Sequence, residues 1–211
     1  MPTTGHITAF ALTAIVIIVI PGPSVMFIVG RALAYGRKAA VLTVVGNTLG
    51  EYIQVIAVAF GVGAVAERSV AVLTGLKLFG AVYLVYLGLK TIRERRSLLE
   101  VLQPAETPSQ RRFLLQGFIV GGTNPKTVVF LVAILPLFVD RADGSLSTQI
   151  LLLGLVFSGI ALLCDNAWGL FAGAVRAWFA KSPKRVELIG GIGGLAIIAV
   201  GVRLALTGRK D

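Results

Sequence analysis

The sequence predicts an all-α integral membrane protein that crosses the bilayer as six helices. Its 211 residues are 56% hydrophobic and only 14% charged, with a mean hydropathy of +0.87. Soluble domains are typically about 45–50% apolar and about 25% charged. Apolar segments of 20 residues or more recur along the chain, and about 20 residues suffice to cross a hydrocarbon core of about 30 Å. Because lipid offers the backbone no hydrogen bonds, spans this apolar are expected to be helices.

Six segments are long and apolar enough to be spans, and they leave no room for a soluble domain, so residues 1–211 are expected to form a single transmembrane domain. The predicted spans are Ile7–Leu33, Ala39–Ala66, Val70–Leu89, Phe113–Val139, Thr148–Val175 and Val186–Leu206.

The basic residues predict the orientation of these spans. Of 20 Lys and Arg residues, 13 lie in or next to the first, third and fifth connections between spans. Connections rich in Lys and Arg remain in the cytoplasm. We therefore expect both termini outside and residues 90–112 to be a cytoplasmic linker. The net charge of +10 is explained by topology, so it does not indicate a nucleic-acid partner.

The chain is poor in the residues that cofactors and redox chemistry need. Cys164 is the single cysteine and His6 the single histidine. A thiol-disulfide mechanism needs two cysteines, and a zinc site needs about four ligands, most often Cys and His. A hydrolase is also disfavoured, because His6 lies at the edge of the chain, away from any candidate nucleophile. We predict that the protein is not an enzyme and holds no cofactor or metal.

Two halves of the chain resemble each other. Gly80–Lys90 in the third span aligns with Gly193–Arg203 in the sixth, and an acid lies 36 or 37 residues before the second glycine in each case, Glu51 and Asp165. Each half holds three spans, and an odd number requires the halves to be inverted in the membrane. We expect one repeat over about 7–90 and the other over about 113–206, which indicates a transporter with a site near the midplane.

Spans 1 and 4 are both broken by proline near their middle. Pro21-Gly22-Pro23 removes the helical donors of the Ile17 and Val19 carbonyls, and Asn124-Pro125-Lys126 does the same for Gly121. The half-helix that begins near Ser24 has free amides suited to a carboxylate, and freed carbonyls suit an ammonium group. A zwitterion needs both. The alternative interpretation is a pair of plain proline kinks.

Three ionisable residues lie deep within the predicted spans: Glu51, Lys126 and Asp165. On an insertion scale each costs about 2.5–3.5 kcal/mol, so they are expected to face an interior cavity or to pair. One interpretation is a structural salt bridge between Lys126 and the acids. The other is a site at which the carboxyls bind protons and substrate. Candidate lining residues near the acids are Asn47, Gln54, Asn166 and Trp168.

Glycines repeat four residues apart in several spans, as in faces where membrane helices pack closely. The pairs are Gly46/Gly50, Gly117/Gly121, Gly169/Gly173 and Gly190/Gly194. The packing is either within one chain or between two copies, so a homodimer is one of the two interpretations.

These motifs together resemble the lysine exporter/homoserine–threonine exporter (LysE/RhtB) family, from about Thr8 to Arg203. The resemblance rests on residues 21–23, 30–32, 36–40, 46–51, 77–90, 113–117, 124–126 and 135–140. Two features depart from the usual pattern. Glu51 stands where Asp is frequent, and Asp165-Asn166-Ala167-Trp168 is typical of only some members.

The resemblance implies export of amino acids or their derivatives across the inner membrane, driven by the proton gradient. The expected site comprises Pro21, Gly22, Pro23, Ser24, Glu51, Asn124, Pro125, Lys126 and Asp165. Export of a metal or other cation, bound by the oxygens of Glu51 and Asp165, is the alternative, although Lys126 would oppose it.

Overall fold

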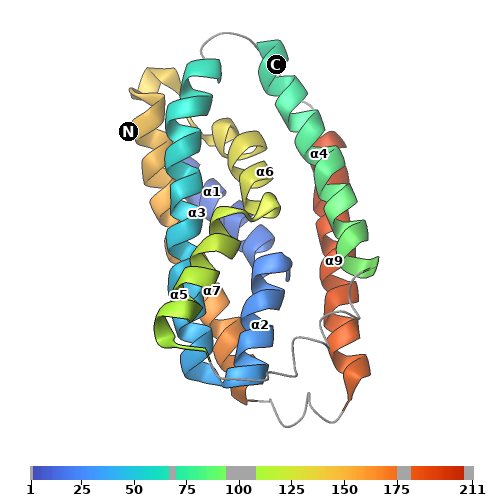
Figure 1. Ribbon diagram of the computed structural model, residues 1–211. Coiled ribbons are helices and arrows are strands. Elements are labelled where there is room, and N and C mark those ends of the chain that lie inside the picture. Colours follow the sequence, from blue (N-terminus) through green and yellow to red (C-terminus); the bar gives the residue numbers. More distant parts are fainter. Residues whose placement is uncertain (1, 67–69, 94–107, 175–181, 207–211) are drawn as a thin grey trace.

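A computed structural model describes residues 2–66, 70–93, 108–174 and 182–206 (Figure 1). The described residues form helices and their connections, without strands. The α-helices are α1 (Thr4–Val19), α2 (Pro23–Tyr35), α3 (Arg37–Ala66), α4 (Val70–Arg93), α5 (Gln110–Gly122), α6 (Pro125–Ala133), α7 (Leu146–Ala174) and α9 (Pro183–Leu206). Two 3₁₀ turns, η2 (Leu135–Phe138) and η3 (Arg141–Asp143), connect α6 to α7.

The helices follow the predicted spans closely, and both proline breaks are present. The α1–α2 pair bends by 53° at its break, and Gln110–Gly122 bends by 43° against Pro125–Phe138. Within the described residues, two helices are long and apolar enough to cross a membrane, and four spans result when each bent pair is counted as one. The α4 and α9 helices have 24 residues each, a length of about 36 Å. The fourth predicted span ends in the 3₁₀ turn η2 rather than in α-helix, because Pro136 lies in its first turn.

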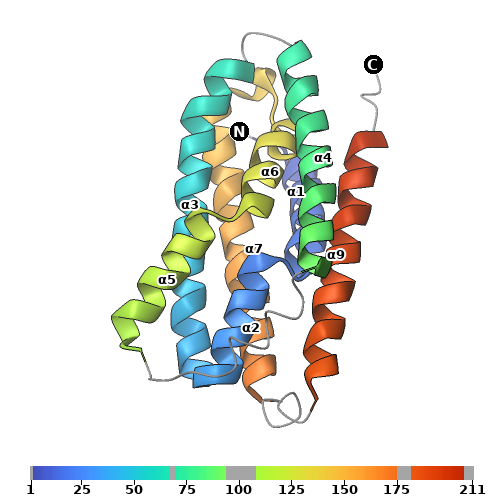
Figure 2. The same ribbon diagram turned by 45° about the vertical axis from the view of Figure 1, so that its right-hand side comes forward.

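The long helix α3 organises the bundle. It packs against α5, α7 and α2, while α1 packs on α7. The α4 and α9 helices pack along each other and stand to one side of this group, with α4 against α6 (Figure 2). The antiparallel pairs α3–α7 and α4–α9 each join one helix from the first half of the chain to one from the second (Figure 1).

Two of the three connections expected to be rich in Lys and Arg, the first and the fifth, are flanked by helix ends at one end of the molecule. The ends of α2 and α7 and the starts of α3 and α9 lie at the lower end of both views, whereas α4 runs toward that end and stops near mid-height (Figures 1 and 2). The breaks between α1 and α2 and between α5 and α6 lie near the middle of the bundle, far from either end.

The predicted glycine faces form the contact between α3 and α5. A Cβ atom at Gly46 or Gly50 would collide with carbonyl oxygens of α5, and one at Gly117 or Gly121 would collide with carbonyl oxygens of α3. The two backbones therefore touch directly, which is the geometry that small residues permit between membrane helices. For these two pairs the packing lies within one chain.

The remaining glycine pairs differ in what the structure describes. Gly169 of α7 lies against Ala40 and Ile28, and Gly173 lies against Arg37, so this face also packs within the chain. The packing of Gly190 and Gly194 lies outside the described side chains.

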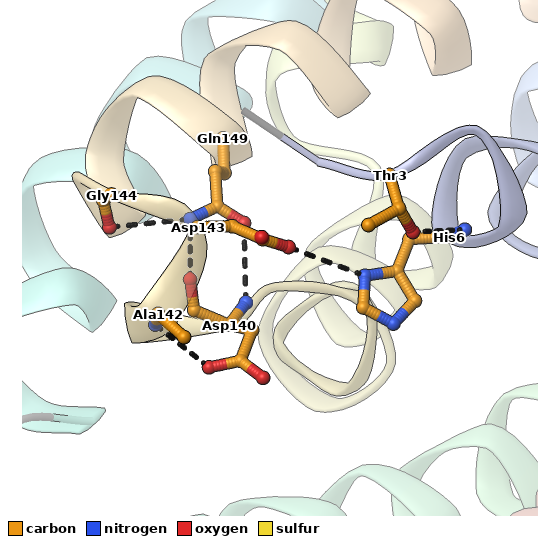
Figure 3. A network of polar contacts seen from close by, with 7 residues as sticks. All are labelled: Thr3, His6, Asp140, Ala142, Asp143, Gly144 and Gln149. Atoms are coloured by element: carbon orange, nitrogen blue, oxygen red, sulfur yellow. Dashed lines mark hydrogen bonds and ion pairs between the residues drawn. The ribbon is translucent and has the colours of Figure 1, made fainter.

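Polar contacts hold the connection between α6 and α7 at the end where α1 begins (Figure 3). The Gln149 side chain donates to the carbonyl oxygens of Asp140, at 2.6 Å, and Gly144, at 3.2 Å, and accepts from the Asp140 amide at 3.1 Å. His6 Nδ1 lies 3.9 Å from a carboxylate oxygen of Asp143, with both side chains partly exposed. The start of α1 thus meets the second half of the chain at this end.

Candidate functional site

A small cavity lies where the two proline breaks meet. Its volume is about 20 Å³, enough for about one water molecule. Its polar or glycine lining is Gly22, Ser24, Glu51, Asn124, Lys126, Thr127 and Asp165, and its apolar lining is Ile17, Ile18, Val25, Phe157 and Ala161. The three ionisable residues predicted within the spans therefore surround one space. This arrangement is tight, and a substrate would need side chains to move.

The two acids approach the cavity from facing helices. Glu51 lies on α3 and is 4% exposed, and Asp165 lies on α7 and is 3% exposed. One carboxylate oxygen of Glu51 accepts from the Thr127 hydroxyl at 3.2 Å, while the other has no hydrogen-bond partner among the described residues. Asp165 accepts from the amide nitrogen of Asn47 at 3.3 Å. Buried acceptors without a donor are costly, so the free Glu51 oxygen indicates a position for a proton or a donor ligand.

Lys126 reaches across the cavity to the other break. It is 6% exposed, and its Nζ donates to the carbonyl oxygen of Ile20 at 2.6 Å. Although both acids are among the described residues, neither has an oxygen within 4.0 Å of this nitrogen. The interpretation as a direct salt bridge is therefore wrong. Sequence periodicity could not identify the Ile20 carbonyl, because this contact joins residues 106 positions apart.

Gly22 leaves room for the Lys126 side chain. A Cβ at position 22 would lie 2.8 Å from Lys126 Cδ and 3.4 Å from Nζ. The glycine between the two prolines thus serves a close approach, and any larger residue there would displace the lysine.

Side chains from the opposite half bind the carbonyls that the prolines expose. Gln54 donates to the Gly121 carbonyl at 2.8 Å, and the Trp168 indole donates to the Val19 carbonyl at 3.3 Å. Gln54 follows Glu51 by three residues, and Trp168 follows Asp165 by three. Each acid-bearing helix is therefore connected to the break of the other half, in the same register.

None of the four candidate lining residues lines the cavity itself. Asn47, Gln54 and Trp168 hold Asp165 and the two breaks, whereas Asn166 donates to the Leu162 carbonyl of its own helix at 2.7 Å. Pro21, Pro23 and Pro125 shape the breaks and do not line the cavity themselves.

The two half-helices that begin at the breaks differ in their caps. The Asn124 side-chain oxygen accepts from the Lys126 amide at 3.1 Å and caps α6. At the start of α2 the N-cap is Gly22, and no side chain of the described residues caps it. The Asn124 side-chain nitrogen donates to the Ser24 hydroxyl oxygen at 2.8 Å, which joins the two breaks.

Arg31 lies close to the first connection between predicted spans and contacts the second half of the chain. It lies within α2, half-buried, and donates to Gln116 of α5 at 2.9 Å. Its guanidinium also lies 4.7 Å from the Phe27 ring centre and 5.4 Å from that of Tyr35. The spacing of four residues from Arg31 to both rings is the signal that could have indicated this cluster. Arg31 therefore joins the two halves of the chain.

Thr127 and Phe157 are site residues that the sequence reasoning missed. Thr127 follows Pro125 by two positions and donates to Glu51. Phe157 stacks on Phe130 at 5.2 Å between ring centres, and Phe130 in turn contacts Phe10 of α1 at 5.7 Å. These three buried rings form an apolar group beside the cavity.

Comparison with known proteins supplies the family. The LysE type translocator family matches residues 15–208, nearly the whole chain. This chain belongs to that family. It is 28% identical to the homoserine/homoserine lactone efflux protein of Salmonella typhimurium, over 93% of this chain and 94% of the relative. It is 24% identical to the leucine efflux protein of an Enterobacter species, over 93% of each chain.

Family membership confirms the resemblance seen in the sequence. It also confirms a transporter rather than an enzyme, and a helical membrane protein. An uncharacterized membrane protein of Vibrio cholerae is 29% identical over 93% of this chain and 95% of the relative. No solved structure is significantly similar to this translocator.

Proposed function

We propose that this LysE type translocator is a secondary transporter that exports amino acids or amino-acid derivatives across the inner membrane in exchange for protons. The observation that carries the proposal is the cavity in which Glu51, Asp165 and Lys126 meet between two broken helices. Intramembrane ionisable residues around a midplane cavity are typical of substrate and proton sites. The relatives named for efflux of homoserine, homoserine lactone and leucine support this substrate class.

The proposed architecture is one domain of six spans in two inverted repeats, 7–90 and 113–206, with residues 90–112 in the cytoplasm and both termini outside. It is supported by the antiparallel pairs α3–α7 and α4–α9 and by the breaks in corresponding positions. The helix ends that flank the first and fifth connections, both rich in Lys and Arg, share one end of the molecule, as a cytoplasmic face would require. The α3–α5 glycine contact uses two of the glycine faces within the chain, and a homodimer would use other surfaces.

In the proposed cycle, proton binding at Glu51 or Asp165 competes with binding of the substrate ammonium. The free oxygen of Glu51 and the oxygens of Asp165 are the acceptors for that ammonium. The uncapped start of α2 receives the substrate carboxylate. Because a proton and an ammonium occupy the same carboxyls in turn, outward movement of substrate is linked to inward movement of protons.

Efflux from proteoliposomes tests this proposal. Vesicles holding the purified protein are loaded with labelled amino acids, and release is followed after a pH gradient is imposed. Glu51→Gln and Asp165→Asn keep the side-chain size but remove the proton site, so we expect both to abolish gradient-driven efflux. Asp140→Asn, an exposed acid outside the cavity, is the matched control and should transport normally. Undiminished gradient-driven efflux by both cavity variants would refute the assignment.

The cation-exporter alternative is separated by ligand stabilisation. Thermal unfolding of the protein in detergent should shift upward with a transported amino acid, because a ligand that binds the folded state stabilises it. A shift with Mg²⁺ or Mn²⁺, and none with any amino acid of the panel, would favour the cation exporter.

A further inference from the structure

The start of α2 combines several unused hydrogen-bond donors at one wall of the cavity. This helix has 13 residues and begins at Pro23, which has no amide hydrogen. The amides of Ser24 and Val25 precede the first backbone bond of the helix, which runs from the Met26 amide to Gly22, and both residues line the cavity. At the other half-helix that starts at a break, α6, the Asn124 side chain caps the helix and occupies the Lys126 amide.

The ammonium group of Lys126 lies at the same place. Its Nζ is bonded to the Ile20 carbonyl at 2.6 Å and lies 3.4 Å from where a Cβ of Gly22, the N-cap of α2, would be. An ammonium carries three N–H donors, and the Ile20 carbonyl takes one of them. The Ser24 hydroxyl accepts from Asn124, which leaves its own hydrogen for another acceptor. A charged donor, a hydroxyl and two amides thus converge on one wall.

The same cavity is also lined by acceptors. Glu51 is 4% exposed and has one carboxylate oxygen without a partner among the described residues, and Asp165 lies beside it in the same cavity. The cavity lining therefore combines the ammonium, hydroxyl and amide donors with two carboxyl acceptors. The ligand that fits both is a small molecule with a carboxylate and an ammonium close together.

A purely structural role for Lys126 does not require its charge. One neutral donor is enough to bond the Ile20 carbonyl. The other carbonyls exposed by the breaks are bonded in this way, by the side-chain amide of Gln54 and the indole of Trp168. A buried ammonium is more expensive than a neutral donor in a membrane protein. The charge is explained if a carboxylate binds there during transport.

We propose that Lys126, together with Ser24 and the start of α2, binds the substrate carboxylate and makes the transporter prefer free amino acids to derivatives with a neutral carboxyl group. This inference rests on the proposed function and adds the residue that selects for the carboxylate. Amides, esters and lactones keep the ammonium that Glu51 and Asp165 bind, but they offer no anion to Lys126.

Competition in proteoliposomes tests the preference. L-Leucine and leucinamide form one probe pair, and L-homoserine and homoserine lactone form a second. Each probe is added at increasing concentration against a labelled amino acid that the wild-type protein transports. We expect the wild type to bind the acid at least tenfold more tightly than its neutral derivative.

The decisive variant is Lys126→Gln, which keeps a neutral donor for the Ile20 carbonyl and loses the charge. The acid-to-derivative preference should fall to about twofold or less, through weaker binding of the acid and unchanged binding of the derivative. Lys126→Arg should keep most of the preference. The control is Lys38→Gln, which removes an exposed charge at the start of α3 and should leave the preference unchanged.

The outcomes separate this inference from the proposed function. If the wild type transports no amino acid of the panel, the proposed function fails. If it transports amino acids without preferring the acid, or if Lys126→Gln keeps the tenfold preference, only the role of Lys126 is overturned. Should Lys126→Gln fail to fold, Ser24→Ala decides. We expect it to lower the preference at least threefold, and an unchanged preference in a transporting Ser24→Ala protein overturns the inference.

Discussion

The direct contact between α3 and α5 predicts that Gly121 does not tolerate even a methyl group. The three atoms nearest to a Cβ at Gly121 all belong to the backbone of Asn47. The carbonyl carbon of Asn47 would lie 2.7 Å from this Cβ, so the two atoms must move apart by about 0.7 Å to reach the 3.4 Å of ordinary contact. A backbone atom cannot rotate away as a side chain can, so the helices must separate.

The cost follows from two opposing effects. Gly→Ala within a helix favours folding by about 0.5–1 kcal/mol. Inserting a methyl group into a packed contact costs about 1–3 kcal/mol, and here it also loosens the neighbouring glycine contacts. Gly159 of α7 is the matched control, because a Cβ there meets nothing within 4 Å. We expect Gly121→Ala to be about 2–3 kcal/mol less stable than Gly159→Ala.

Thermal unfolding of both variants in the same detergent measures the difference. For a chain of this length 1 kcal/mol corresponds to about 2–4 °C, so the melting temperatures should differ by roughly 4–12 °C. Because Asn47 also donates to Asp165, Gly121→Ala should reduce transport as well. Equal melting temperatures for the two variants would show that α3 and α5 do not touch in this way.

Three further predictions concern contacts away from the cavity surface. Gln54→Leu removes the 2.8 Å hydrogen bond to the Gly121 carbonyl, while that carbonyl keeps the 3.2 Å bond from the Asn124 amide. We therefore expect the free energy of unfolding in detergent to fall by about 0.6–1.7 kcal/mol and efflux to become slower. An unchanged unfolding curve would contradict this role. Arg31→Met removes the 2.9 Å bond to Gln116 and the ring contacts, and it should lower stability by about 1–2 kcal/mol, with Arg31→Lys recovering only part. His6→Ala should shift the melting temperature by less than about 2 °C, since its 3.9 Å ion pair is partly exposed, and a larger shift would mean that this pair holds the fold.

Local sequence predicted the helices because the membrane imposes a simple rule on each span. Length and apolarity are properties of contiguous residues, so α1 to α9 follow the predicted segments. The proline breaks were predictable for the same reason, since Pro23 and Pro125 act on carbonyls four residues earlier in the same span. The one local error, the 3₁₀ turn after Ile134, also has a local cause in Pro136.

The sequence predicted where the buried ionisable residues would gather, but it did not predict which atoms they would contact. Burying three ionisable residues is expensive, which was reason enough to expect Glu51, Asp165 and Lys126 around one space. The same reasoning allowed a salt bridge, and only the folded chain shows Lys126 on the Ile20 carbonyl instead. The contact of Arg31 with Gln116 joins residues 85 positions apart, so no local pattern of the sequence predicts it.

The sequence by itself determined that this protein is a helical membrane transporter with two broken spans and three buried ionisable groups, because composition, span length and proline chemistry act within a few neighbouring residues. The tertiary structure decided which groups meet. Gln54 and Trp168 bind the carbonyls exposed by the breaks of the opposite half, and Lys126 lies beside the uncapped start of α2. Such pairings depend on how distant helices cross, and the close α3–α5 contact that positions Glu51 exists only once the glycine faces have packed.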